Sequence, residues 1–133
     1  MQADHGVVRD FGDRIQRKLE RWNLIAKEAS EQAYLSTPVT IEGVITKEDL
    51  EKYRSDLNVF ADLGPGDHIM NAKLPHHESM TIVIGPEGGF SESEVKYFNS
   101  KEFAQISLGK SVLRAETASI IACALVRASE AIA

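Results

Sequence analysis

The stretch that most constrains the fold of this chain is residues 81–95, TIVIGPEGGFSESEV. Residues 81–84 are β-branched and predict a short buried strand, which ends abruptly in the glycine-rich residues 85–89. Ser91 and Glu94 then have the spacing of a capping box, so a helix is expected to begin there. In open α/β sheets, ligands bind at the carboxyl ends of strands. The sequence therefore predicts a binding site at this loop.

A second loop of the same type follows. Residues 104–108 predict another strand, Gly109 interrupts it, and residues 110–117 lead into a final helix. The two glycine turns are expected to form two walls of one pocket. A phosphate-binding P-loop is not supported, because the position that needs its first glycine is Ala104. A dinucleotide fingerprint is not supported either, because the glycine spacing of residues 85–89 differs from it.

Upstream, apolar residues at helical spacing predict a long amphipathic helix that is capped by Asp13 and ends before Pro38. Trp22 lies on its apolar stripe, so core packing is favoured over stacking on a base. The stripe comprises Ile15, Leu19, Trp22, Ile25, Ala26, Ala29 and Ala33. The outer face carries the cations Arg14, Arg17, Lys18 and Arg21. Two interpretations of these cations stay open, a solvated helix surface and a patch that contacts RNA phosphates.

The remaining elements are shorter. Residues 39–45 and 57–63 predict strands, and residues 46–54 contain a short capped helix. Residues 64–79 predict a loop. Its side chains His68, His76, His77 and Glu78 lack the spacing of metal ligands, so no metal is expected. In the final helix, a face of small and aliphatic residues is expected to pack against the sheet or a second subunit. That face comprises Ala118, Ile121, Ala122, Leu125, Ser129 and Ile132.

Composition sets broad limits on the class of protein. The 133 residues have the size of a single domain, 1–133, with residues 1–12 as a loose lead-in. The net charge of −5 means that contact with nucleic acid requires a local basic patch. Cys123 is the one cysteine, and we expect it in the core. No segment has the pattern of a signal peptide or a membrane span, so a cytoplasmic protein without membrane contact is expected.

Three blocks of residues together resemble the RsmE family, uridine-N3 methyltransferases that modify 16S ribosomal RNA of the small subunit. The blocks are residues 84–90, IGPEGGF, residues 108–118, LGKSVLRAETA, and the upstream Arg21-Trp22, Ile25, Glu28-Ala29 and Glu31-Gln32. The resemblance implies an α/β domain of the SPOUT type, with a mostly parallel sheet flanked by helices and a C-terminal trefoil knot. It also implies S-adenosylmethionine (SAM) as cofactor, small-subunit ribosomal RNA as partner and a homodimer.

The resemblance also implies roles for particular residues. The backbone of two segments would hold SAM: Ile84, Gly85, Pro86, Glu87, Gly88 and Gly89, then Leu108, Gly109, Ser111, Val112 and Leu113. Residues 61–64 would belong to a further cofactor loop. Arg114 would stabilise the anion formed when uracil N3 loses its proton, and Glu116 would act as the base or orient Arg114. The alternative for this pair is a structural ion pair at the head of the last helix.

Two departures from the family pattern leave a second function open. Family members carry an N-terminal RNA-binding domain and an opening strand and helix, and this chain is expected to be truncated before them. Leu35 stands where the family usually has arginine. The alternative function is a non-catalytic, dimeric module that binds SAM or associates with RNA.

Overall fold

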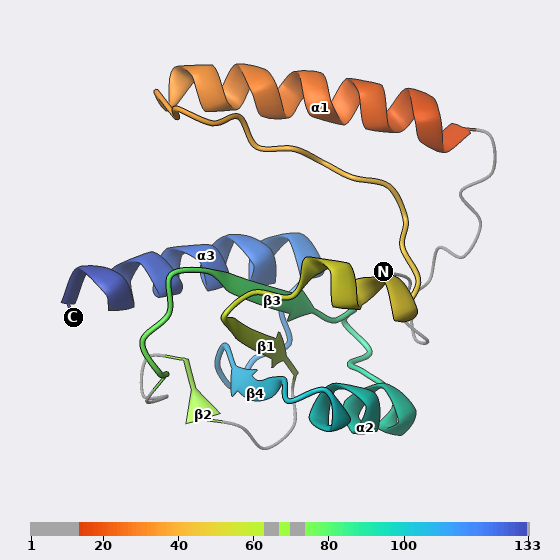
Figure 1. Cartoon of the computed structure of the whole chain (residues 1–133), viewed down its shortest axis with the longest axis vertical. Helices are drawn as coiled ribbons and strands as arrows, with labels where there is room; N and C mark the ends of the chain where they lie inside the picture. Colours follow the sequence, from red (N-terminus) through yellow and green to blue (C-terminus); the bar gives the residue numbers. More distant parts are fainter. Residues whose placement is uncertain (1–13, 63–66, 70–73, 133) are drawn as a thin grey trace. The chain divides into compact units, whose positions relative to one another are not determined.

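The computed structural model describes residues 14–62, 67–69 and 74–132. These residues belong to two compact units, one containing residues 14–47 and the other containing the described residues from 48 onward. Figure 1 shows the elements of both units. The expected lead-in at residues 1–12 and the expected cap Asp13 lie outside the described residues.

The first unit contains helix α1 (Ile15–Gln32), which confirms the predicted long helix. Its described amino end is Arg14, which makes no side-chain capping bond. The apolar stripe is largely exposed: Trp22 is 38% exposed and Ile25 is 52% exposed. The expectation that Trp22 packs in the core is therefore wrong, and Ser30 is the buried residue of this helix. The side of α1 that is buried is the side that contacts residues 39–45.

That segment, residues 39–45, is extended but forms no strand, so the predicted strand is wrong. The side-chain amide of Asn23 bonds Ile41 in both directions, donating to its carbonyl at 2.7 Å and accepting from its N–H at 2.8 Å. Ser30 Oγ accepts the N–H of Val39 at 3.0 Å. Backbone groups that a neighbouring strand would satisfy are satisfied here by side chains of α1.

The described residues of the second unit form a four-stranded sheet, in which every strand pairing is parallel. Its strands are β1 (Leu57–Ala61), β2 (Asp67–His68), β3 (Met80–Ile84) and β4 (Ala104–Ser107), in the order β2-β4-β1-β3. The mostly parallel α/β class is confirmed, and β2 adds a short strand within the predicted loop. β1 is the central strand and is buried throughout. β3, expected to be buried, lies at the sheet edge with Val83 as its buried residue.

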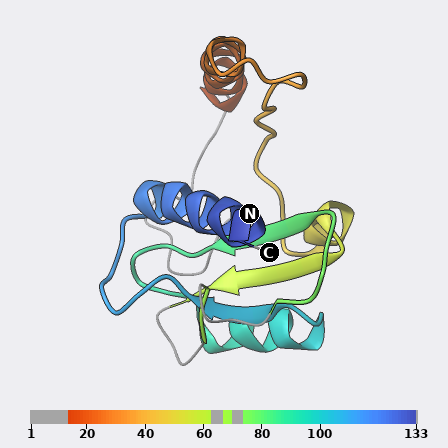
Figure 2. The same ribbon diagram turned by 90° about the vertical axis from the view of Figure 1, so that its left-hand side faces the viewer.

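In the part of this unit that the structure describes, three helices accompany the sheet. They are the 3-10 helix η2 (Glu48–Tyr53), α2 (Glu92–Ser100) and α3 (Ala115–Ile132). α2 and α3 lie on opposite sides of the strands (Figure 2). The capping box that predicted the start of α2 is confirmed: Ser91 Oγ accepts the N–H of Glu94 at 3.3 Å, and Glu94 accepts the N–H of Ser91 at 2.8 Å.

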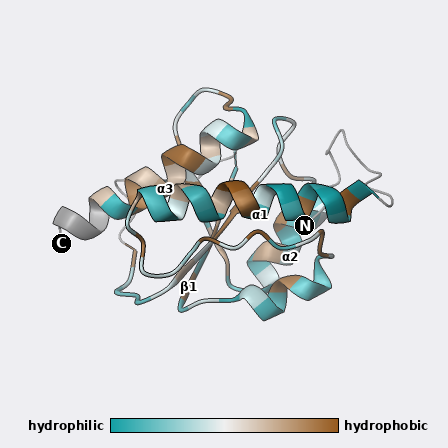
Figure 3. Cartoon of the chain, turned by 90° about the horizontal axis from the view of Figure 1, so that it is seen from above, coloured by the Kyte–Doolittle hydropathy of each residue, from teal (hydrophilic) through white to brown (hydrophobic). Residues whose placement is uncertain are grey.

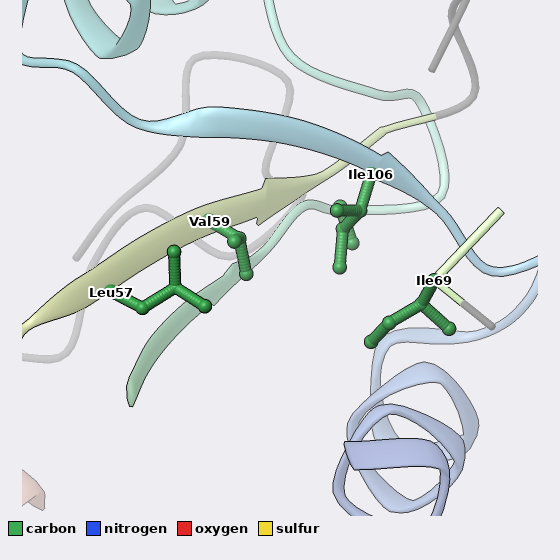
Figure 4. Close-up of a cluster of buried hydrophobic side chains, with 5 residues drawn as sticks. Leu57, Val59, Ile69 and Ile106 are labelled. Atoms are coloured by element: carbon green, nitrogen blue, oxygen red, sulfur yellow. The ribbon is translucent and has the colours of Figure 1, made fainter. Parts of the chain in front are cut away.

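Alternate residues of β1 build the core on both faces of the sheet, as the two-residue period of a strand requires. Leu57, Val59 and Ala61 form one cluster with Ile69 and Ile106, four of which are labelled in Figure 4. Leu125 and Val126 of α3 pack against this cluster. On the opposite face, the rings of Phe60 and Phe98 are stacked with their centroids 5.0 Å apart, which joins β1 to α2.

Helix α3 is more apolar than α1 over most of its length (Figure 3). Ala118 and Ala122 are buried, and Ile121 and Leu125 are half-buried, so the predicted sheet-facing side is confirmed at these positions. Cys123 is exposed, and its expected burial is wrong. One step along the helix from Ala122 rotates a side chain by about 100°, which is enough to carry it out of the contact.

Candidate active site

The carboxyl ends of β1, β3 and β4 surround a pocket that is open to solvent, and its empty space, open solvent included, is about 450 Å³. The first predicted loop contributes Ile84, Gly85, Pro86, Glu87 and Gly89, and the second contributes Leu108, Gly109, Ser111, Val112 and Leu113. Every residue predicted to hold the cofactor lines this pocket except Gly88. The structure therefore brings the two loops together, while their role in cofactor binding stays a prediction.

The two loops meet although their strands are not neighbours. β1 lies between β3 and β4, so the loops approach each other across its end. Glu87 Oε1 accepts the N–H of Ala115 at 3.3 Å, a bond between residues 28 positions apart in the chain. Ala115 is the first residue of α3, where backbone N–H groups have no partner within the helix and the helix dipole is positive. The Glu87 carboxylate thus links the first loop to the end of the second.

The first loop needs glycine at two positions for different reasons. A Cβ added to Gly85 would lie 3.0 Å from Cε2 of Phe90, closer than ordinary contacts allow. Gly89 has a φ of 73°, in the left-handed region that side chains disfavour. A Cβ at Gly89 would also lie 3.2 Å from Oδ1 of Asp62. Glycine therefore lets this loop pass close to Phe90 on one side and to Asp62, which follows β1, on the other.

The second loop is held by the residue that ends β4. Ser107 Oγ accepts the N–H of Gly109 and donates to its carbonyl, both at 3.2 Å. This compact turn places Leu108 and Gly109 at the pocket. Val112 is 61% exposed although it lines the pocket, so an apolar side chain at this edge is accessible to a ligand.

The residues predicted to be catalytic lie just beyond the pocket wall. Arg114 follows Leu113, a lining residue, and its carbonyl accepts the N–H of Ala118 at 2.8 Å. Its side chain and that of Glu116 are exposed. Within the described part of the chain, the two side chains form no ion pair, so the structural alternative for Arg114 and Glu116 is not supported. Their catalytic roles stay predictions.

The predicted RNA-contacting residues Arg14, Arg17, Lys18 and Arg21 belong to the first unit, and all four are exposed. Leu35, the residue that departs from the family pattern, lies past the end of α1 in the same unit and is 47% exposed.

Three further residues line the pocket, namely Ala61, Asp62 and Ala118, and of these only Ala118 lies outside the predicted cofactor loops. Ala61 ends β1 and Asp62 follows it. The resemblance had pointed to residues 61–64 as a further cofactor loop, and residues 63 and 64 lie outside the described residues. Ala118 is on the first turns of α3, and its small, buried side chain lets the helix lie close to the pocket.

Neither a metal centre nor a membrane span is evident in the described residues. No group of three or more His, Cys, Asp or Glu side chains there is placed to hold a metal ion. Equally, no helix among those residues combines the length and apolarity needed to cross a bilayer.

A parallel α/β sheet whose glycine loops enclose a pocket at the carboxyl edge defines a ligand-binding α/β domain. The chain belongs to the RNA methyltransferase domain family, whose model matches residues 1–127. The resemblance to the RsmE family is confirmed by relatives named ribosomal RNA small subunit methyltransferase E. The protein of Rickettsia conorii is 37% identical over 113 residues, which cover 82% of this chain and 46% of that relative.

The Bacillus subtilis relative of the same name is 32% identical over 130 residues, covering 91% of this chain and 51% of its own. The chain thus spans about half the length of these relatives. The solved structures with a similar fold include ribosomal RNA small subunit methyltransferase E of Neisseria gonorrhoeae, bound to SAM. Its TM-score is 0.74 and its identity is 28%, and the match covers 93% of this chain and 51% of that chain. A Legionella pneumophila protein described as a methyltransferase, with bound SAM, has a TM-score of 0.82 and 25% identity, over 96% and 52%.

Proposed function

We propose that this chain is the catalytic part of a SAM-dependent methyltransferase that acts on N3 of a uridine in small-subunit ribosomal RNA. The observation that carries the proposal is the pocket formed by the two glycine loops over the end of β1. Membership of the RNA methyltransferase domain family supports the reaction class. The names of the relatives support ribosomal RNA as substrate, and the SAM-bound neighbours support the cofactor.

The residues of the pocket suit the chemistry of SAM. The pocket is concave and open to solvent at the carboxyl edge of the sheet, so a small molecule can enter it. Ile84, Leu108 and Leu113 offer apolar surface for the adenine ring, and the glycines expose backbone groups for its polar edge. Asp62 supplies a carboxylate for the hydroxyl or cationic groups of the ligand, and the Glu87 carboxylate holds the first loop through its bond to the N–H of Ala115.

When bound, SAM supplies an electrophilic methyl group to the acceptor. The chain's part is to align that methyl with uracil N3 and to remove the N3 proton. Arg114, next to the pocket wall, stabilises the negative charge that develops on the base. Glu116 accepts the proton or orients Arg114. Because N3 is hidden in a base pair, the acceptor is an unpaired or flipped uridine.

RNA is held in part by the basic face of α1. Arg14, Arg17, Lys18 and Arg21 are exposed within three helical turns, which suits contact with successive phosphates. Such contacts would make binding strongly dependent on salt. A ribosomal substrate also implies that the protein works in the cytoplasm.

The C-terminal part forms the trefoil knot of the SPOUT type. Support comes from membership of the family and from the bond between Glu87 and Ala115, which holds the loop after β3 against the head of α3.

The protein acts as a homodimer. Ile120 is 71% exposed on α3, and Cys123 and Ala124 beside it are exposed too, which leaves small and apolar side chains on this helix for a second copy. Ile120→Glu is expected to yield monomers in light-scattering chromatography. Monomers already present in the unmodified protein would contradict the dimer.

Calorimetric titration with SAM, followed by incubation of the protein with small ribosomal subunits, tests the function. We expect binding, and a methylated uridine that stops reverse transcription. Arg114→Ala is expected to lower methyl transfer at least 100-fold while SAM affinity stays within about threefold. Arg127→Ala, which removes an exposed cation of α3, is the matched control and should leave transfer unchanged. Absence of SAM binding, or equal loss in both variants, would contradict the proposal.

A further inference from the structure

Asp62 lies at the floor of the pocket, between its two walls. It is the first residue after the central strand β1, which is flanked by β3 on one side and β4 on the other. Its backbone N–H donates to the carbonyl of Ile106 in β4 at 3.2 Å. Its Oδ1 lies 3.2 Å from the point that a Cβ on Gly89 would occupy. Asp62 therefore lies between β4 and the loop that contains Gly89, and it carries a negative charge there.

The pocket lining carries charge of only one sign among the described residues. Asp62 and Glu87 are its two carboxylates, and no lysine or arginine lines it. Glu87 already bonds the N–H of Ala115 at the positive end of α3. Asp62, which follows the central strand, brings the second carboxylate to the same lining. Its charge lies beside the space between the loops, where it acts on the ligand that occupies that space.

We propose that Asp62 is a specificity-determining residue that favours the cationic methyl donor SAM over its neutral thioether product, S-adenosylhomocysteine. The inference rests on the proposed function. The two ligands share the adenosyl and amino-acid parts and differ by the methyl group and the positive charge on sulfur. A half-buried carboxylate stabilises a nearby cation and gives no such stabilisation to a neutral sulfur. Methyl transfer therefore removes the attraction and favours release of the product.

The test is calorimetric titration of both ligands into the unmodified protein, Asp62→Asn and Glu87→Gln. Both substitutions keep the shape of the side chain and remove one negative charge from the same lining. Asp62→Asn is expected to weaken SAM about tenfold, which corresponds to about 1.4 kcal/mol, and to leave S-adenosylhomocysteine nearly unchanged. Glu87→Gln is the matched control. It is expected to change both affinities by the same factor, because Glu87 acts through the loop and α3.

A second measurement needs no variant. In the unmodified protein, the ratio of SAM to S-adenosylhomocysteine affinity is expected to fall as salt is raised, because salt screens the charge that separates the two ligands. A constant ratio, or equal weakening of both ligands by Asp62→Asn, would overturn the role of Asp62 and leave the methyltransferase proposal standing. If the unmodified protein binds neither ligand, the proposed function itself fails, and the inference fails with it.

Discussion

Replacing Gly85 with alanine tests how the first glycine loop is packed. The added Cβ would lie 3.0, 3.1 and 3.3 Å from three carbons of the Phe90 ring. That ring is 8% exposed and is held edge-on by Phe60 and Phe98, with centroid distances of 6.0 and 5.0 Å. Because Phe90 has no room to withdraw, the loop itself must move or the aromatic cluster must loosen.

The sign of the stability change in Gly85→Ala distinguishes this clash from the stabilisation that a glycine-to-alanine replacement usually gives. A glycine replaced without a clash stabilises a protein by about 0.4 to 1 kcal/mol, because the unfolded chain loses freedom. Overpacking a closed site costs about 1 to 3 kcal/mol. We therefore expect Gly85→Ala to lower the free energy of unfolding by about 1 to 2 kcal/mol. Gly43→Ala is the matched control, since its Cβ would meet only Leu19 at an ordinary 3.6 Å.

The assay is equilibrium unfolding in urea of Gly85→Ala, Phe90→Leu and the double variant. Leucine at position 90 removes ring carbons that the new methyl group would strike. The double variant is therefore expected to lose about 0.5 to 1 kcal/mol less free energy of unfolding than the two single losses added together. Additive losses, or a Gly85→Ala protein as stable as the Gly43→Ala control, would refute the steric explanation.

Three further substitutions test local features by the same unfolding assay. Ser91→Ala removes the oxygen that caps Glu94 and is expected to cost about 1 kcal/mol; an unchanged midpoint would contradict this. Glu102 has a φ of 59°, so Glu102→Gly is expected to stabilise by about 0.5 to 1 kcal/mol, whereas a loss would show that its side chain matters more than its backbone. Asn23→Ala removes both hydrogen bonds to Ile41 and is expected to cost about 1 to 3 kcal/mol. It is also expected to speed proteolysis at residues 39–45. Unchanged proteolysis would show that Asn23 does not hold this segment.

The elements that the sequence predicted best are those that depend only on residues close to one another in the chain. The capping box of Ser91 and Glu94 satisfies its own backbone bonds, so the start of α2 depends little on the rest of the fold. Residues 39–45 show the opposite case. Their alternation fits a strand, but a strand also needs a partner, and Asn23 and Ser30 on α1 provide the bonds instead. The pattern within the segment carries no information about that choice.

The burial errors have a related cause. Helical spacing identified an apolar stripe that includes Trp22, and a mean preference for buried cysteine pointed to Cys123. Burial, however, depends on which face a partner covers. In α1 that face is defined by Ser30 and Asn23, and in α3 by Ala118 and Ala122. Residue type alone does not indicate which face of a helix is covered by the rest of the protein.

The candidate site divides along the same line. Its walls are visible in sequence because each combines a strand end with glycines, a pattern contained in a few consecutive residues. Its floor has no such local pattern. The family resemblance implies a further cofactor loop at residues 61–64, but the position of Asp62 between the walls depends on the strand order β4-β1-β3, which is set by pairing between distant segments. The same order makes Asp62 different in kind from Gly85. A change at Gly85 acts on one wall through Phe90, whereas a change at Asp62 acts on the space that both walls share, and so on the discrimination between ligands rather than on the packing of a loop.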